Sequence, residues 1–358
     1  MTRPTRPTSR STHPTSRTVL LPRTVLLPSR ARRKRWISAP YLLALLALSS
    51  PAQPLVLDKH IPLPALEGRL DHMAADPSTH RLFLAAFGNN TVEVIDTDSG
   101  QIIHTLTGLK QPQGILFWPA GGRFYVANAA DGRVTAFDAS TYAILRTYDF
   151  NGGDADNFGF DPELKEVWVG YGEALGVISA PLGTAVGDVM LGAHPESFQL
   201  ETHGQRVFVN VPEATAGPHV SVIDRRTRSV TAQWPLPPGI TGNYPLALDE
   251  PGHRLFVGCR KPAELLTVDT QSGKMTVLAP IPGDADDLFY DATQKRIYVS
   301  GGEGSIAVLD DAGKSLAAIP TAKGARTSLS VPELKRLFVA VPHHGKQQAE
   351  LLVFRVGP

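Results

Sequence analysis

The feature that most constrains this sequence of 358 residues is a unit of about 42 residues that recurs seven times. Each copy has an apolar residue followed by an aromatic residue near the start of an apolar run. These landmarks are Leu82-Phe83, Phe124-Tyr125, Val167-Trp168, Val207-Phe208, Leu255-Phe256, Ile297-Tyr298 and Leu337-Phe338. Within a copy, short runs of apolar and β-branched residues alternate with turns rich in Gly, Asn and Asp. This alternation predicts four short strands in each copy.

Seven such copies predict an all-β fold, a seven-bladed β-propeller of four-stranded antiparallel blades. The last copy has room for only three strands, the third of which ends near residues 351–354. One further apolar stretch, residues 55–61, comes before the first copy. We expect this N-terminal strand to pair into the last blade as its outer strand, because the ring then closes without an open sheet edge.

Residues 1–52 have a different composition from the repeats. Four basic residues, 32–35, precede the apolar run of residues 41–48, which is too short to span a bilayer. Ser50 and Ala52 are small, as a signal peptidase requires. The sequence therefore predicts a basic leader plus signal peptide in residues 1–52, cleaved near Ala52, and a single propeller domain in residues 53–358. An uncleaved membrane anchor is the alternative.

Removing this leader changes the charge of the protein. Residues 1–53 hold ten of the 35 basic residues and none of the 34 acidic ones, so the remainder has 25 against 34, a net charge of −9. An acidic protein repels phosphate backbones, so we expect no nucleic-acid partner. The single cysteine, Cys259, cannot form an internal disulfide. We expect a periplasmic or secreted monomer, with no membrane span after cleavage.

The repeat becomes more specific around its second landmark. Residues 125–128 read Tyr-Val-Ala-Asn, residues 131–134 read Asp-Gly-Arg-Val, and Phe137-Asp138 follow. This pattern resembles the YVTN-type repeat, and the chain after the leader resembles the YncE-like seven-bladed propellers of bacterial envelopes. The resemblance implies the fold and an envelope location. It implies no particular chemistry, because that family is functionally heterogeneous and its motif is structural.

Polar residues gather where each inner strand is expected to start. These starts rim a central funnel, where several blades can hold one ligand together. Residues 154–157 and 284–287 read Asp-Ala-Asp-Asn and Asp-Ala-Asp-Asp, three blades apart, so we expect them to face each other across the funnel. The candidate ligand-binding residues are Arg69, Asp71, His72, Asp154, Asp156, Asn157, His194, Glu196, Asn243, Tyr244, Asp284, Asp286, Asp287 and Arg326.

Three interpretations of this funnel remain open on the sequence alone. In the first, a divalent cation such as calcium is held by the carboxylates of Asp71, Asp156, Glu196 and Asp286, while the imidazoles of His72 and His194 would favour zinc or a transition metal. In the second, the funnel binds a small ligand or a partner protein, with Arg69 and Arg326 gripping an anion. In the third, the aspartates cap turns and pair with these two arginines.

The sequence therefore predicts an exported binding or scaffold protein with a polar central funnel for a small ligand, ion or protein partner. The alternative is an enzyme that uses the same funnel, either a metal-dependent lactonase or hydrolase, or a propeller similar to the quinoprotein dehydrogenases. The sequence contains no Gly-x-Ser-x-Gly elbow, phosphate-binding Gly-rich loop or Cys-x-x-Cys-His haem site. No catalytic residue is assigned.

Overall fold

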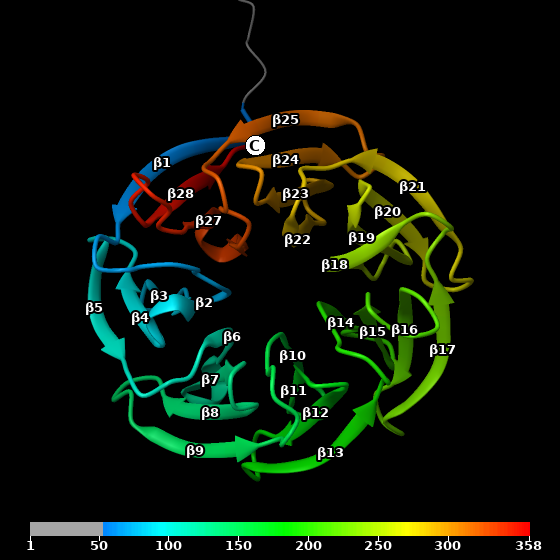
Figure 1. Cartoon of the computed structure of the whole chain (residues 1–358), viewed down its shortest axis with the longest axis horizontal. Coiled ribbons are helices and arrows are strands. Elements are labelled where there is room, and N and C mark those ends of the chain that lie inside the picture. Colours follow the sequence, from blue (N-terminus) through cyan, green and yellow to red (C-terminus); the bar gives the residue numbers. More distant parts are fainter. Residues whose placement is uncertain (1–52) are drawn as a thin grey trace, which may run out of the picture. The chain divides into compact units, whose positions relative to one another are not determined.

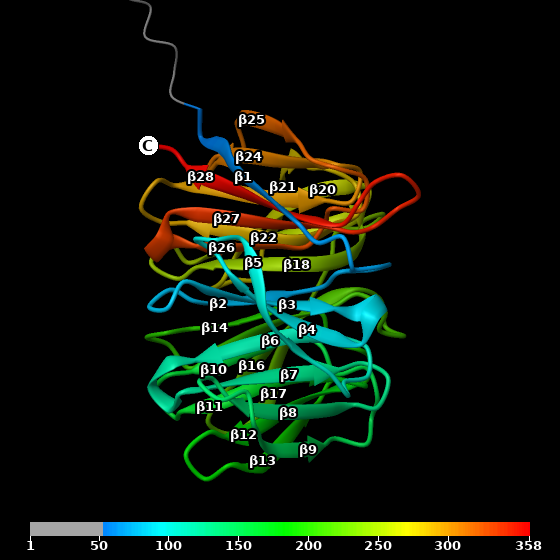
Figure 2. The ribbon, with the colours of Figure 1, turned by 90° about the vertical axis from the view of Figure 1, so that its left-hand side faces the viewer.

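The computed structural model describes residues 53–358, and seven four-stranded antiparallel sheets make up this part of the chain. The sheets are arranged in a ring, with the first strand of each near the axis and the last strand on the rim (Figure 1). Seen from the side, the blades follow one another around the disc (Figure 2). The predicted seven-bladed β-propeller is therefore confirmed. The predicted leader and signal peptide lie outside the described residues.

Six blades are formed by four consecutive strands each. Blades 1 to 3 contain β2 (Met73–Asp76), β3 (Arg81–Ala86), β4 (Thr91–Asp96), β5 (Gln101–Leu106); β6 (Pro112–Trp118), β7 (Arg123–Asn128), β8 (Arg133–Asp138), β9 (Ile144–Asp149); β10 (Phe158–Asp161), β11 (Glu166–Tyr171), β12 (Ala174–Ser179) and β13 (Thr184–Met190). Blades 4 to 6 contain β14 (Phe198–Leu200), β15 (Arg206–Val211), β16 (His219–Asp224), β17 (Ser229–Pro235); β18 (Thr241–Asp249), β19 (Arg254–Lys261), β20 (Ala263–Asp269), β21 (Met275–Pro280); β22 (Ala285–Asp291), β23 (Arg296–Gly301), β24 (Ser305–Asp310) and β25 (Ser315–Pro320).

The seventh blade closes the ring with both ends of the described chain. It contains β26 (Ser328–Val331), β27 (Arg336–Val341) and β28 (Glu350–Val356), and its outer strand is β1 (Leu55–Pro62). β1 pairs antiparallel with β28, from Leu55 opposite Val356 to Pro62 opposite Glu350. The predicted closure by the N-terminal strand is thus observed. The helices of the described part are three-residue 3-10 turns, and none is long and apolar enough to cross a membrane.

The landmark residues build the packing between neighbouring blades. Their aromatic rings are fully or almost fully buried, and the rings of Phe83 and Phe124 stack with centroids 4.5 Å apart across the boundary between blades 1 and 2. Buried apolar side chains of adjacent blades form seven clusters, one at each boundary. The core is therefore distributed around the ring, and each blade is stabilised by its two neighbours.

The arginine that precedes several landmarks also joins neighbouring blades. Arg81 Nη1 donates to the carbonyl oxygen of Ala139 in blade 2 at 2.6 Å, and Arg254 Nη1 donates to that of Asp311 in blade 6 at 3.1 Å. Arg206 and Arg296 reach Thr270 and Gly357 in the same way. Each guanidinium holds the turn after the third strand of the next blade, or the chain end that takes its place. This contact explains why a basic residue recurs at this point of the repeat.

Candidate functional site

In blades 1 to 6 the inner strand starts with an irregularity, whereas in blade 7 only the N–H of Ala340 follows the same pattern, by donating to the carbonyl oxygen of Thr327. The N–H of Asp71 donates to the carbonyl oxygen of Ala85, and the N–H of Ala85 donates to that of His72, so two residues oppose one. The same pattern joins Asp156 and Asn157 to Gly170. In β6, β18 and β22 the pairing with the second strand shifts by one residue at the same place. This β-bulge breaks the alternation of a regular strand, so consecutive side chains can face the funnel.

The bulges place one residue of each blade at an equivalent level around the axis. We call these seven residues the axial ring: Asp71, Gln113, Asp156, Glu196, Tyr244, Asp286 and Arg326. A buried residue precedes each of them, for example Ala155 and Ala285. Two positions before the ring, Asp154 and Asp284 have φ angles of 46° and 53°. Asp tolerates this left-handed conformation, which explains the backbone role of the first Asp in each Asp-Ala-Asp sequence.

A cavity of about 190 Å³ lies within the axial ring, and all seven blades contribute to its wall. Six of the seven ring residues line it, whereas Asp71 is fully buried beside it. The other lining residues are Arg69, His72, Asp154, Asn157, His194, Ser197 and Arg260. The cavity is therefore bounded almost entirely by polar and charged side chains.

The structure brings most of the predicted site residues together, at three different levels. The axial ring contains Asp71, Asp156, Glu196, Tyr244, Asp286 and Arg326; the rim before it contains Arg69, Asp154, His194 and Asp284; the level after it contains His72, Asn157 and Asp287. Asn243 lies elsewhere. It is fully buried and donates to Asn210 Oδ1 at 3.1 Å and to the carbonyl oxygen of His219 at 3.0 Å. Asn243 therefore joins blades 4 and 5 and does not line the cavity within the axial ring.

The three arginines at the cavity are paired with carboxylates of the protein. Arg69 Nη2 lies 2.6 Å from Asp71 Oδ2, and Arg326 Nε lies 3.0 Å from Asp286 Oδ2. Arg260 also pairs with Asp286, and its guanidinium carbon stacks 3.7 Å from the centroid of the Tyr244 ring. This pairing is what the third interpretation of the sequence predicts for Arg69 and Arg326.

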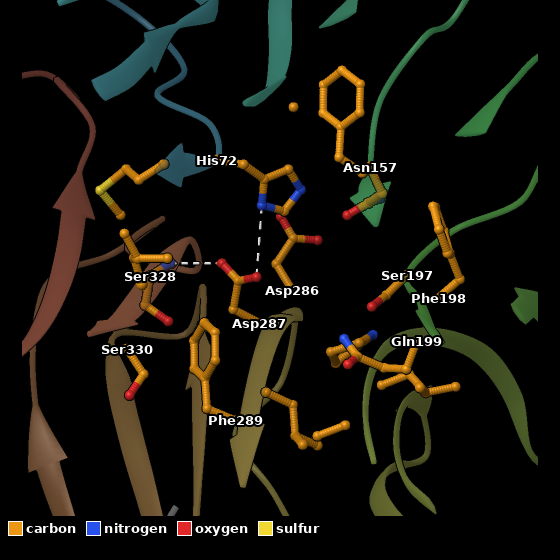
Figure 3. Close-up of a pocket in the computed structure, with 18 of the residues that line it drawn as sticks. His72, Asn157, Ser197, Phe198, Gln199, Asp286, Asp287, Phe289, Ser328 and Ser330 are labelled. Carbon is orange, nitrogen blue, oxygen red and sulfur yellow. Dashed lines mark hydrogen bonds and ion pairs between the residues drawn. The ribbon is translucent and has the colours of Figure 1, made fainter. Parts of the chain in front are cut away.

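His72 lies just below the ring among three carboxylates. Its Nδ1 is 3.6 Å from Asp287 Oδ1, and its Nε2 is 3.8 Å from both Asp71 Oδ1 and Asp156 Oδ1. Asp287 is fixed by the backbone N–H of Ser328, at 2.6 Å (Figure 3). Burial alone would lower the pKa of His72, but Asp287, Asp71 and Asp156 together raise it well above its ordinary value of 6.5.

Two carboxyl groups of the ring have no hydrogen-bond partner for their side chains. Asp156 is 7% exposed, and its Oδ1 makes no hydrogen bond within the described part of the chain. Burial raises its pKa, although His72 and Arg69 oppose the shift. Glu196 makes no side-chain hydrogen bond or ion pair with any residue of the range 53–358. Burial, followed by the nearby Asp156 and Asp286, raises its pKa to about 8.

A second cavity of about 330 Å³ continues along the axis on the other side of His72. His72, Asn157, Ser197 and Asp286 line both cavities, so they separate the two. Phe198 and Phe289 lie at the second cavity (Figure 3), and Phe158 and several aliphatic side chains also line it. The channel is thus lined by charged and polar side chains within the ring, and by a mixture of polar and apolar side chains beyond it.

Sequence analysis missed three residues of the cavity wall, Gln113, Ser197 and Arg260. Gln113 occupies the ring position of blade 2 and donates from Nε2 to Asp154 Oδ1 at 3.0 Å. Arg260 comes from the end of β19, a second strand, whereas only inner-strand starts were searched. The sequence position of Arg260 does indicate its location, because the end of a second strand lies beside the start of the antiparallel inner strand.

The metal prediction can be compared with the contacts of its four carboxylates. Within residues 53–358, no group of three or more His, Cys, Asp or Glu residues is arranged to hold a metal ion. Asp71 is paired with Arg69, and Asp286 with Arg260 and Arg326, so two of the four predicted ligands already face cations. Asp156 and Glu196 keep free oxygens. A calcium site remains a prediction, and the arginines at two of its ligands count against it.

Comparison with known proteins supports the fold alone. No family model matches the sequence, and no curated protein matches it. By structure, 1743 solved chains match. One of them, Kuenenia stuttgartiensis Hydrazine Synthase, has a TM-score of 0.71 at 16% sequence identity, over 82% of this chain and 98% of that chain. At this identity the likeness establishes a β-propeller, a fold that serves many functions. The resemblance to YncE-like proteins remains a prediction from the repeat motif.

Proposed function

We propose that this chain is an exported binding protein of the YncE-like kind, and that its binding site for a small polar ligand is the cavity within the axial ring. Export is inferred from the basic and apolar leader in residues 1–52, and the family from the motif in residues 125–138. The propeller fold is consistent with a binding or scaffold protein.

One observation carries the proposed site. Asp156 lines the cavity, and its buried Oδ1 accepts no hydrogen bond from the described residues. Buried polar atoms are almost always hydrogen-bonded, because an unmade bond costs about 1–3 kcal/mol. A bound ligand with a hydrogen-bond donor would give this carboxyl group the partner that the protein does not supply. The cavity of about 190 Å³ is smaller than a typical drug-sized site of roughly 300 Å³ or more, which favours a compact ligand.

A thermal-shift screen tests this proposal. The protein purified after export is melted with a panel of small polar compounds, and a ligand of the cavity should raise the melting temperature in a saturable way. Asp156→Asn should weaken that response, whereas Glu333→Gln, which changes an exposed carboxylate in a 3-10 turn, should leave it unchanged. Equal responses of both variants would place the ligand outside the axial cavity.

An enzyme is the second candidate, and one observation favours it. Glu196 has a pKa of about 8, so it is mostly protonated at neutral pH and can donate a proton to a leaving group. A hydrolase acting on a lactone or ester could use such a general acid. In this case Glu196→Gln should abolish hydrolysis of simple lactones, and a chelator would show whether the reaction also requires a metal. Equal hydrolysis by the variant and the unchanged protein would exclude this role.

A further inference from the structure

We propose that the axial cavity takes a small protonated amine, whose ammonium group is held between the carboxylates of Asp156 and Glu196. This inference rests on the proposed function, because it assigns a chemical class of ligand to the same cavity. A ligand binds most readily to charged groups that have no partner within the protein. Which of the arginines and carboxyl groups are unpaired therefore indicates the charge of the ligand.

An anionic ligand would have to compete for the arginines. Arg326 is bound by Asp286 and, through Nη1 at 3.1 Å, by Asp284. Arg260 is held by Asp286 and donates from Nε to the carbonyl oxygen of Ala285 at 2.9 Å. Arg69 is paired with Asp71 through Nη2, although its side chain is 38% exposed, and its buried Nε has no hydrogen-bond partner in the described part of the chain. The guanidinium groups are therefore largely neutralised before any ligand arrives.

The free groups of the cavity are hydrogen-bond acceptors. Asp156 Oδ1 has its nearest cation, His72 Nε2, at 3.8 Å, which is too long for a hydrogen bond. The Glu196 carboxyl faces the same cavity with no side-chain partner among the described residues. An ammonium group has three N–H donors and no acceptor, so it can satisfy both carboxylates at once.

The balance of charge at the funnel points the same way. The seven carboxyl groups at or beside the cavity are those of Asp71, Asp154, Asp156, Glu196, Asp284, Asp286 and Asp287. Only three guanidinium groups, those of Arg69, Arg260 and Arg326, lie among them. Carboxyl groups therefore outnumber guanidinium groups by four at the funnel. A cationic ligand lowers the repulsion that remains.

The protonation of these groups supports the proposal and gives it a measurable consequence. The pKa values of Asp156 and Glu196 are both raised by burial, and for Glu196 by Asp156 and Asp286 as well. The groups that face these two carboxyls are Asp71, His72, Asp154, His194, Tyr244, Asp286 and the three arginines. An ammonium between them would lower both pKa values, so binding should release protons. The affinity should then rise as the pH increases from 6 to 8.5, while the amine itself stays protonated.

Calorimetric titration with four matched probes tests the inference. The probes are n-butylamine, n-butanol, butyrate and calcium chloride, each added to the exported protein at pH 6, 7 and 8.5 in two buffers of different ionisation enthalpy. We expect n-butylamine alone to bind, with proton release and an affinity about tenfold higher at pH 8.5 than at pH 6. Asp156→Asn and Glu196→Gln should each weaken binding by about tenfold or more, and Glu333→Gln should leave it unchanged.

The other outcomes separate this inference from the function on which it rests. If butyrate, n-butanol or calcium binds in place of the amine, and Asp156→Asn abolishes that binding, the assignment of an amine ligand is wrong but the cavity remains a ligand site. Amine binding that is unaffected by both cavity variants would place the amine elsewhere and overturn the inference. Absence of binding for all four probes at every pH would count against both. The pH series on the unchanged protein keeps the test valid even if Asp156→Asn does not fold.

Discussion

At the residue scale, identical residue types in the axial ring have acquired different environments. Asp156 and Asp286 are the third residues of matching Asp-Ala-Asp sequences, three blades apart. Asp286 lies between Arg260 and Arg326, whereas Asp156 has only the more distant His72 and a raised pKa. The difference comes from neighbours supplied by other blades. The two equivalent positions therefore differ in charge environment although their sequences match.

The pH dependence of stability should reveal the raised pKa of Glu196. Its folded-state pKa of about 8 exceeds the ordinary value of 4.5, so between these values the native protein keeps a proton that the unfolded chain loses. Stability therefore falls as the pH rises through this window. We expect the melting temperature to decrease by several degrees, about 2 to 4 kcal/mol in unfolding free energy, between pH 5.5 and 8.5. His72, whose pKa is also raised, contributes with the same sign.

Scanning calorimetry of variants assigns this effect. Glu196→Gln cannot ionise, so its melting temperature should fall less over the same range, whereas Glu333→Gln should follow the unchanged protein. Hydrogen bonds from Thr227 lower the pKa of the turn carboxylate of Asp224. Such carboxylates lose their stabilising charge at low pH, so the melting temperatures are compared only above pH 5. If the pH profile of Glu196→Gln matches that of the unchanged protein, the carboxyl is ionised in the native state.

At the scale of the element, the ring depends on one pairing between distant parts of the chain. β1 supplies the outer strand of blade 7, and without it β28 would present an open edge. The register of β1 shifts between Leu57 and Lys59, and residues on the two sides of this shift differ in burial. Ile61 is 1% exposed and packs in the cluster between blades 7 and 1, whereas Leu57 is 44% exposed. The strand therefore contributes both backbone pairing and apolar burial at the seam.

Two alanine substitutions in β1 separate these contributions. Ile61→Ala removes buried methylene and methyl groups at the seam and should lower the unfolding free energy by about 2 to 4 kcal/mol. Leu57→Ala lies on the same strand but is half exposed, so its effect should stay within about 0.5 kcal/mol. Urea denaturation followed by circular dichroism measures both. Equal effects of the two variants would contradict closure of the ring through burial at Ile61.

The elements could be predicted from the sequence because their signals are local. Landmark spacing, turn residues and strand alternation gave the seven blades and the closing strand, and the inner-strand starts gave most of the funnel residues. The bulges could not be predicted, since a two-to-one register leaves no residue signature of its own. For that reason Asn243 was expected in the funnel, although only its neighbour Tyr244 lines the cavity. Arg260 was missed because it lies at the end of a second strand, although that position is next to an inner-strand start, and its partner Asp286 belongs to the neighbouring blade.

Glycine positions show the same limit of sequence reasoning. Gly114 follows the ring residue of blade 2, in a stretch with no charged residue to attract attention. A Cβ at this position would lie 2.0 Å from the carbonyl oxygen of Asp156. The backbones of blades 2 and 3 can approach this closely only because residue 114 has no side chain. The position of Asp156 in the cavity therefore depends on a neighbouring blade.

At the scale of the whole molecule, fold and function are carried by different parts of the protein. The inter-blade clusters and the arginine contacts to neighbouring turns repeat around the ring and account for the propeller. The axial residues differ from blade to blade, and they account for the charge of the funnel. Because a propeller fold serves many functions, the fold alone does not assign one to this protein, and the proposed site depends on the axial residues.

Export is a property of the whole chain, and the predicted cleavage gives it a direct test. The full sequence has a mass of 38.5 kDa. When it is expressed in a bacterium, we expect the periplasmic protein to start at Gln53, because Ser50 and Ala52 are small as signal peptidase requires. Intact-mass spectrometry and N-terminal sequencing measure where the exported protein starts.

Two arginine substitutions test the cleavage site. Ala52→Arg should leave the precursor uncut, while Gln53→Arg should still be processed, because residue 53 lies after the small residues that signal peptidase requires. Full-length protein retained in the membrane fraction would identify the leader as an anchor. Full-length protein in the cytoplasm would contradict export. In both cases the leader stays attached, so the net charge of −9 expected for the mature chain would not apply.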